Sequence, residues 1–320
     1  MSASGNGRCA LRGLRAVVGS KTFAYSQFSG AWTRFSDVPL PGVLPPTQQL
    51  SSPLVGLGNN TAWYAPSQQL QGFANIDEEW VAMRNTSLDT GMQETPNGVP
   101  VVSADGETLY LPMWIFRGFS KDPPTSSFVR VFDVTGNPDA PLVEKVDLWT
   151  PLSTTNTAYN VGGNLAVSAS GSVVLPYGGQ EQYPGGVFVY KWDKARRNFT
   201  QQFNASSPYG SGDGYGISAT IDDATGLVAV GAPYTNPSPR SRAYIYWDAA
   251  QPGKHGMQCW ALEAPPSAPT GTSNFGTSVA ATTDDDGHSM LLVGDGFLSY
   301  VAVYAIDTPA RANDGVGLGV

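Results

Sequence analysis

Short apolar runs alternate with turn-forming residues along the whole chain, and no segment of ten or more residues shows the hydrophobic period of a helix. One element recurs, a strand-like run that ends in an aromatic residue or Ile followed by Asp. Its copies close at Asp77, Asp133, Asp193, Asp248 and Asp307, and a copy with Ser in place of Asp closes at Ser29. These closing residues lie 48 to 60 residues apart, a spacing typical of solenoids and propellers.

Three more strand-like segments accompany each copy. One lies before it and is bounded by Gly or Pro, as in 227–231 (LVAVG) and 290–294 (MLLVG). Another stands further upstream, such as 216–221, and is joined by turn residues such as DDATG at 222–226. The fourth follows the Asp and often holds Trp, as in 257–261. Four short strands in each repeat predict the blade of a β-propeller.

The expected fold is therefore all-β, a single β-propeller domain over residues 1–320 with about six four-stranded blades. The blades are expected at residues 8–40, 52–88, 99–150, 160–205, 214–263 and 275–320. After Asp307 the sequence is rich in Gly and makes a poor strand. The last blade is thus expected to close either with three strands or with a strand from a partner.

Composition and charge narrow the class of partner. Only 14% of the residues are charged, and no run of 18 apolar residues is present to predict membrane insertion. The formal net charge is −8, and no cluster of Lys or Arg extends beyond Arg196 and Arg197. Nucleic acid and anionic membranes both demand a basic surface, so neither is an expected partner.

Three segments carry a resemblance to a known repeat: 274–279 (NFGTSV), 214–218 (GYGIS) and 228–233 (VAVGAP). They resemble the FG-GAP repeat, which forms the blade of the integrin α-subunit propeller and of many extracellular and microbial surface proteins. The resemblance covers most of the chain and is sharp only from residue 160 onward. It implies a β-propeller fold, and a fold of this kind leaves the function open.

The calcium-binding version of this repeat implies a loop of carboxylates in the hairpin between the first two strands. In the last unit that hairpin reads TTDDDGHSM at 282–290. With Asp284 and Asp286 at the middle ligand positions, the outer positions fall on Thr282 and Met290, and Met is no oxygen donor for calcium. A solvated acidic turn is the expected structure, and we expect neither a metal site nor a cofactor.

Catalytic signatures are missing from the sequence, which has no GxSxG elbow, HExxH helix, Walker loop or dinucleotide fingerprint. The two histidines, His255 and His288, are too few for a histidine metal cluster and lie in turn-like segments. We therefore expect a protein that is not an enzyme. A pair of carboxylates at the axis of a propeller would suffice for a glycan hydrolase, so that alternative stays open.

Long connections between second and third strands share one face of a propeller, and three of them hold aromatic or Arg residues. The candidate binding residues are Trp114, Phe116, Arg117, Tyr177, Tyr183, Tyr234 and Arg240. Trp, Tyr and Arg dominate the energetics of interfaces, and aromatic rings also stack on sugars. For Trp114 and Phe116 the alternative is a small core packed beneath their own loop, because an exposed Trp-Ile-Phe cluster would favour aggregation.

The expected function is that of a non-catalytic structural or adhesive β-propeller that docks to other proteins of an assembly through these loops. A glycan-binding lectin-type propeller is the alternative, and a glycan-acting hydrolase is the second alternative. The repeat type implies an extracellular surface, whereas residues 1–8 lack the apolar stretch of a signal peptide. A particle assembled inside the cell, such as a virion, would satisfy both observations.

Cysteines and glycosylation sequons bear on the compartment. Cys9 falls in the first strand of the first unit and Cys259 in the fourth strand of the fifth, so in a ring of six they are expected too far apart for a disulfide. Two buried free thiols are the expectation. Asn-x-Ser/Thr sequons at Asn59, Asn85, Asn198 and Asn204 would suit a secreted surface protein.

Overall fold

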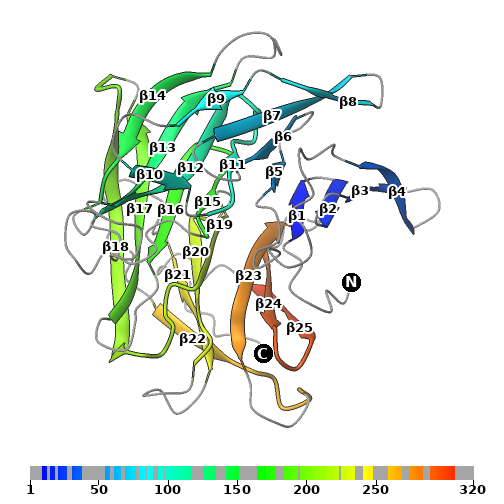
Figure 1. Cartoon of the computed structure of the whole chain (residues 1–320). Coiled ribbons are helices and arrows are strands. Elements are labelled where there is room, and N and C mark those ends of the chain that lie inside the picture. The colour runs from blue at the N-terminus through cyan, green and yellow to red at the C-terminus, as the bar shows by residue number, and fades with distance from the viewer. Residues whose placement is uncertain are drawn as a thin grey trace. The chain divides into compact units, whose positions relative to one another are not determined.

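Figure 1 shows the computed structural model of the chain, whose described regular elements are all β-strands. The described residues are 9–12, 15–18, 21–26, 31–37, 55–57, 61–65, 69–76, 79–83, 85–88, 93–96, 98–116, 126–134, 142–150, 164–177, 184–193, 195–222, 225–234, 241–247, 259–268, 274–283 and 289–306. Up to residue 57 the description covers the backbone alone. The chain divides into two compact units, residues 1–163 and residues 164–320.

Unit 1 holds three antiparallel sheets whose strands mostly pair in chain order. The first sheet contains β1 (Cys9–Arg12), β2 (Arg15–Val18), β3 (Lys21–Ser26) and β4 (Ala31–Asp37). The second contains β5 (Val55–Leu57), β6 (Thr61–Tyr64), β7 (Gln69–Ile76) and β8 (Glu79–Ala82), with β9 (Thr86–Ser87) also pairing with β7. The third contains β10 (Gln93–Pro96), β11 (Val101–Val102), β12 (Thr108–Phe116), β13 (Ser126–Asp133) and β14 (Val143–Leu148).

Unit 2 repeats the same arrangement. One sheet contains β15 (Ala166–Val167), β16 (Ser172–Tyr177), β17 (Pro184–Asp193) and β18 (Asn198–Ser211). The next contains β19 (Ser218–Asp222), β20 (Leu227–Ala232), β21 (Arg242–Tyr246) and β22 (Cys259–Glu263). A three-stranded sheet follows, with β23 (Phe275–Thr283), β24 (Ser289–Asp295) and β25 (Tyr300–Ile306). The predicted fold class, all-β with four-stranded antiparallel blades, is confirmed, and the closure of a single six-bladed ring stays a prediction.

The sheets of each unit bury apolar faces against one another. In unit 1 the core gathers side chains of β6, β7, β12 and β13, including Trp63, Leu111 and Phe128, which are at most 1% exposed. In unit 2 one core lies between β16, β17, β20 and β21, and a second contains residues of β20, β21, β24 and β25. Strand β20 is apolar on both faces and buried along its whole length, because its residues take part in both of these cores.

Two glycines with positive φ fix how consecutive sheets of unit 2 pack. Tyr215 and Phe275 are fully buried, and each is followed by a glycine, Gly216 with φ +87° and Gly276 with φ +93°. A Cβ on Gly216 would lie 2.5 Å from the carbonyl oxygen of Tyr177 in the preceding sheet. A Cβ on Gly276 would collide in the same way with the backbone of β20 and β21. Only glycine fits at either position, because the backbone needs both the left-handed conformation and the close approach.

The partners of the two glycines are equivalent residues. Gly216 faces Tyr177 and Gly186, which are cross-strand partners of β16 and β17. Gly276 faces Ala232 and Arg242, which are cross-strand partners of β20 and β21. The same junction therefore occurs twice in unit 2, where the second strand of the preceding sheet ends and its third strand begins. This recurrence is structural evidence for the repeat detected in the sequence.

The third sheet differs from the sequence-based expectation. Residues 113–116 were expected in a loop, whereas β12 continues through Phe116 and pairs with β10 on one side and β13 on the other. That placement was wrong because the apolar run of β12 continues past Pro112, whose missing N–H does not prevent pairing along the rest of the strand. β10 was not predicted, since the segment QETP has little strand propensity and is stabilised by its tertiary partner.

Candidate functional site

The seven predicted binding residues differ in how far the structure describes them. Tyr177 and Tyr234 lie among the described residues, as does Trp114. Phe116 ends β12 and only its backbone is described. Arg117, Tyr183 and Arg240 fall outside the described residues.

Trp114 occupies a strand and not a loop. It pairs with Ser127 of β13 and with Thr95 of β10, and its side chain is half-buried with a buried indole Nε1. Trp114 therefore lies in a central strand, between β10 and β13, and contributes to the packing of this sheet. The role of Trp114 in binding a partner stays a prediction.

Tyr177 ends β16, and its ring lies flat against its own sheet. A Cβ on Gly186 would overlap the phenol, so the glycine makes room for the ring. The ring also stacks on Phe188, with the centroids 5.3 Å apart, and the hydroxyl lies 3.4 Å from Ser206 Oγ. Tyr177 is therefore half-buried, and its ring makes its contacts within its own sheet.

Tyr234 follows β20 and is 47% exposed. Its backbone N–H donates to the carbonyl oxygen of Asp213 at 2.9 Å, and its ring lies over Gly214, where a Cβ would be 2.7 Å from the ring. Asp213 itself is only 1% exposed. The exposed Tyr234 ring is thus positioned by the buried residues Asp213 and Gly214, which precede β19.

Sequence reasoning missed Asp213, which holds a second tyrosine as well. Asp213 Oδ2 accepts from the Ser207 hydroxyl at 2.5 Å, and Ser207 Oγ in turn accepts from the Tyr209 N–H at 3.1 Å. Asp213 Oδ1 also accepts from the Tyr215 N–H at 3.0 Å, which is the turn-forming hydrogen bond of an Asp side chain. The sequence offered one signal, since Asp213 directly precedes the GYG segment.

Tyr209 and Arg242 form the most specific contact of this region. Tyr209, near the end of β18, is 41% exposed, and the Arg242 guanidinium lies 5.0 Å from the centroid of its ring. Arg242 also donates to the Tyr209 hydroxyl and, through Nη2, to Glu263 Oε1 at 2.9 Å. Burial tends to lower the pKa of Arg242, but the hydrogen bonds to Glu263 and Tyr209 outweigh it and raise that pKa above its usual value, so the guanidinium is permanently charged.

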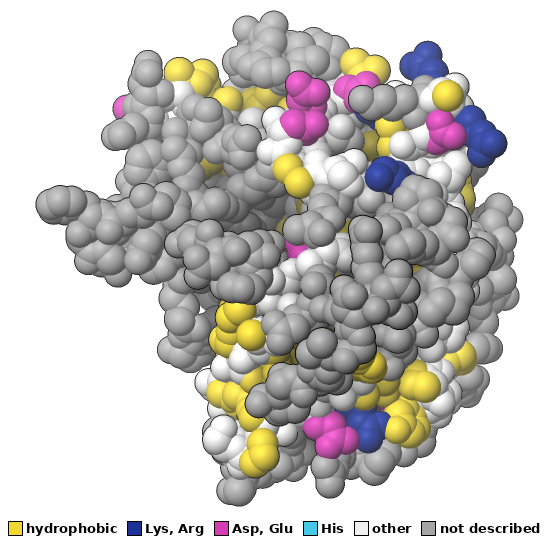
Figure 2. Space-filling model, turned by 180° about the vertical axis from the view of Figure 1, so that it is seen from behind, with side chains coloured by type: hydrophobic (Ala, Val, Ile, Leu, Met, Phe, Trp, Pro, Cys, Tyr) yellow, Lys and Arg dark blue, Asp and Glu magenta, His cyan; other side chains and the backbone are white. Residues whose placement is uncertain are grey.

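We call Tyr209, Tyr234 and Arg242 the tyrosine–arginine patch. Its two rings are exposed, the backbone N–H of each tyrosine is linked by hydrogen bonds to Asp213, and its cation is paired with Glu263. The patch offers aromatic surface, hydroxyls and a stacked guanidinium. On the face of the molecule in Figure 2, basic and acidic side chains likewise lie next to one another, and hydrophobic side chains border them near the lower edge.

A second cluster of charged residues lies in the third sheet of unit 1. Arg130 is 4% exposed and donates to Glu94 at 2.8 Å and, from Nε and Nη2, to Asp147 at 2.9 and 3.0 Å. Burial works against the charge of Arg130, yet the hydrogen bonds to Asp147 and Glu94 raise its pKa above the usual value. Because its donors are already used within the sheet, Arg130 stabilises the sheet and offers little to an external ligand.

The described part of the chain contains neither a cluster of metal ligands nor a membrane-spanning helix. Within it, no three His, Cys, Asp or Glu side chains come together in a way that could hold a metal ion. The hairpin residues 284–288 lie outside the described residues, while Thr282 and Met290 flank them as cross-strand partners. None of the described segments forms a helix of the length and hydrophobicity needed to cross a membrane.

Comparison with known proteins gives distant structural likeness only. No family model matches the sequence, and no curated protein matches it. Among solved structures, a protein assigned as a 6-phosphogluconolactonase from Bacteroides fragilis has a TM-score of 0.47 and 13% identity, covering 79% of this chain and 68% of its own. Regucalcin from Agrobacterium tumefaciens, described as a calcium-binding protein, has a TM-score of 0.46 and 12% identity, covering 88% and 77%.

A luciferin-regenerating enzyme is similar at a TM-score of 0.43 and 12% identity, covering 91% of this chain and 86% of its own. These structures are β-propellers. At such scores the likeness carries no argument about activity, and the blade-type architecture of this chain rests on the order and register of its own strands.

Proposed function

We propose that this chain is a non-catalytic structural or adhesive propeller of the FG-GAP type, which docks to other proteins of a surface or virion assembly. The tyrosine–arginine patch is the proposed docking site. The recurring Tyr-Gly and Phe-Gly junctions at Gly216 and Gly276 support the FG-GAP part of the proposal, because they give the paired aromatic and glycine a packing role.

The observation that carries the docking site is the exposure of Tyr209 and Tyr234 on a rigid support. Exposed aromatic side chains often mark binding sites, and the backbone of these two is held through Ser207 and Asp213. The ring of Tyr209 also contacts Arg242, and the ring of Tyr234 lies over Gly214. A preorganised ring loses little conformational entropy on binding. Tyr and Arg are also the residue types that dominate binding energy at protein interfaces.

The charge of the patch limits the kind of partner. Arg242 is paired with Glu263, and Asp213 is buried, so no unpaired charge of these residues faces outward. We therefore propose a partner surface that is apolar or polar but uncharged, and an association that depends weakly on salt. Recruitment of a strongly charged partner by this patch would contradict the proposal.

A glycan-binding role for the same patch is the second candidate. The exposed ring of Tyr234 favours it, since sugar rings stack on aromatic faces and the Tyr209 hydroxyl and Arg242 supply hydrogen bonds. A glycan array probed with the full-length protein separates the two proposals. Specific binding that is lost in Tyr234→Ser would favour the lectin role.

The test of protein docking is a site-specific photocrosslinker at Tyr234 in the cells that make the protein. We expect one or a few defined crosslinked proteins, and a strong reduction when Tyr209→Ser is added. The matched control places the crosslinker at Val143, an apolar residue of β14 that is 54% exposed. Equal crosslinking from both positions would contradict a specific docking site.

A further inference from the structure

The outer strand β18 has an unusual composition for its position. It is 14 residues long, occupies the fourth place in its sheet, and pairs with β17 alone among the described strands. None of its residues is charged, and its first nine residues, 198–206, also lack Pro. A long edge strand of this kind exposes unpaired backbone N–H and C=O groups that can pair with another chain.

The other strands in the fourth position carry the protection that β18 lacks. Each of them, within the described part of the chain, contains at least one charged residue: Arg34 and Asp37 in β4, Glu79 in β8, Glu144, Lys145 and Asp147 in β14, and Glu263 in β22. Charged side chains on an edge discourage pairing, because a neighbouring strand would have to bury them. β18 must be protected by other means or left open.

What β18 carries in their place is a pair of glycosylation sequons. Asn198-Phe-Thr200 begins the strand, and Asn204-Ala-Ser206 follows six residues later. Both asparagines are exposed. In an extended strand six residues span about 20 Å, so the two positions divide the charge-free edge between them. No other described fourth strand contains a sequon.

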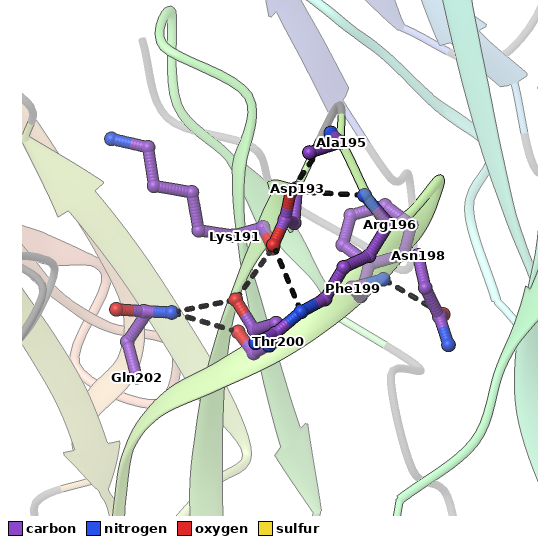
Figure 3. Close-up of polar contacts among 8 residues, drawn as sticks. All are labelled: Lys191, Asp193, Ala195, Arg196, Asn198, Phe199, Thr200 and Gln202. Atoms are coloured by element: carbon purple, nitrogen blue, oxygen red, sulfur yellow. Dashed lines mark hydrogen bonds and ion pairs between the residues drawn. The ribbon is translucent and has the colours of Figure 1, made fainter.

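Both asparagines use Oδ1, and not the Nδ2 atom to which a sugar attaches, in the hydrogen bonds of their side chains. Asn198 Oδ1 accepts from the Phe199 N–H at 2.8 Å, and Asn204 Oδ1 accepts from Gln201 Nε2 at 3.2 Å. An N-linked sugar attaches to Nδ2 and would keep both bonds. Figure 3 shows Asn198 directly after the turn, with its side chain directed away from Thr200 and Gln202.

We propose that Asn198 and Asn204 carry N-linked oligosaccharides, which cover the open edge of β18. The donor is a lipid diphosphate-linked oligosaccharide. A bond forms between Asn Nδ2 and the anomeric carbon of the first sugar, and the bond from that carbon to the diphosphate oxygen breaks. The diphosphate leaves with the electron pair, and Nδ2 loses one proton. This inference does not depend on the docking function proposed above.

The first test identifies the modification on the protein from the cells that make it. The full chain is treated with peptide-N-glycosidase in water enriched in oxygen-18, which converts each glycosylated Asn to a labelled Asp, and peptides covering 198–206 are analysed by mass spectrometry. We expect label at Asn198 and Asn204. Unmodified Asn at both positions overturns the proposal, and so does label confined to Asn85, an exposed sequon away from β18.

The second test asks whether the glycans protect the edge. The folded protein is deglycosylated under native conditions with an endoglycosidase, which leaves one sugar on each Asn and adds no charge to the edge, and its size is measured by light scattering before and after. We expect larger species after treatment, and the same for the variant Asn198→Gln/Asn204→Gln, whereas Asn85→Gln keeps the size of the untreated protein. Adding Gln201→Lys should reverse the association by restoring a charge to the edge. An unchanged size after deglycosylation overturns the protective role and favours an edge that pairs with nothing.

A different outcome would assign the edge to a second copy of this chain. If the untreated protein carries no sugar at either asparagine and Gln201→Lys converts a dimer to a monomer, β18 pairs with its counterpart in another molecule. That result would contradict glycosylation directly.

Discussion

Asp213 accepts a hydrogen bond from the Ser207 hydroxyl at 2.5 Å, and this contact links a buried carboxylate to the exposed end of β18. Ser207 then holds the backbone of Tyr209, while the Asp213 carbonyl oxygen holds Tyr234. One buried residue thereby supports the backbone of both tyrosines of the tyrosine–arginine patch. The consequence is that the stability of the loop and the shape of the patch depend on the same side chain.

Asp213→Ala should therefore lower both stability and crosslinking from Tyr234. The substitution removes a buried acceptor of the Ser207 hydroxyl and the Tyr215 N–H, and we expect the free energy of unfolding to fall by about 2–3 kcal/mol in denaturant titrations. Asp193→Ala is the control, because Asp193 accepts from two turn N–H groups but is only half-buried. If both variants lose the same amount, Asp213 has no special role.

Gly216→Ala and Gly276→Ala should each destabilise the protein strongly. A methyl group would meet backbone atoms of the preceding sheet and would force a side chain into a positive φ, so we expect a loss above about 2 kcal/mol. Gly106→Ala and Gly171→Ala share the positive φ of +81° and have nothing within 4 Å of the new Cβ. These controls should lose about 1 kcal/mol. Similar losses in all four variants would show that packing at the junction contributes nothing.

Arg130→Met should be among the most damaging substitutions in unit 1. Glu94, which is 4% exposed, would be left buried without its cation, and the expected cost is about 3–5 kcal/mol by urea unfolding. Lys145→Met removes a surface ion pair with Asp133 and should cost less than about 1 kcal/mol. A small loss for Arg130→Met would contradict the stabilising role of this ion pair.

Alkaline pH should destabilise the fold through its buried tyrosines. Burial raises the pKa of Tyr190 and of Tyr244 from 10.0 to about 12. The folded state therefore favours the protonated phenols, and their contribution to stability is complete below pH 10 and is lost as the pH rises from 10 toward 12. Urea unfolding across this range should show the decline, with a shallower slope for Tyr190→Phe. A stability independent of pH between 10 and 12 would contradict the assignment.

Calcium should be dispensable for stability. Thr282 and Met290 are cross-strand partners in the hairpin of β23 and β24, where a calcium-binding repeat would place ligands. Thermal melts recorded with calcium and with a chelator are expected to coincide. A drop of several degrees on chelation would reveal a bound cation, because a ligand of the folded state raises the melting temperature.

The sequence by itself determined the local architecture. Alternating apolar runs and turn residues predicted the four-stranded sheets, because side-chain periodicity and turn chemistry are local properties. The GYG and NFG segments marked the two positions where β19 and β23 meet the preceding sheets. A glycine at such a junction can be recognised from the sequence alone, since no other residue tolerates the backbone conformation that the junction requires.

The tertiary structure decided which side chains come together. The apolar run of β12 extends over Trp114, but the sequence did not show a strand on its other side, since β10 owes its pairing to contacts made across the sheet. The aromatic loops are far more prominent in the sequence than Tyr209, Asp213 and Arg242. These three residues come together because the end of β18 lies beside the loop before β19 and the start of β21. Burial and long-range hydrogen bonding set these positions, and neither property is encoded in the neighbours along the chain.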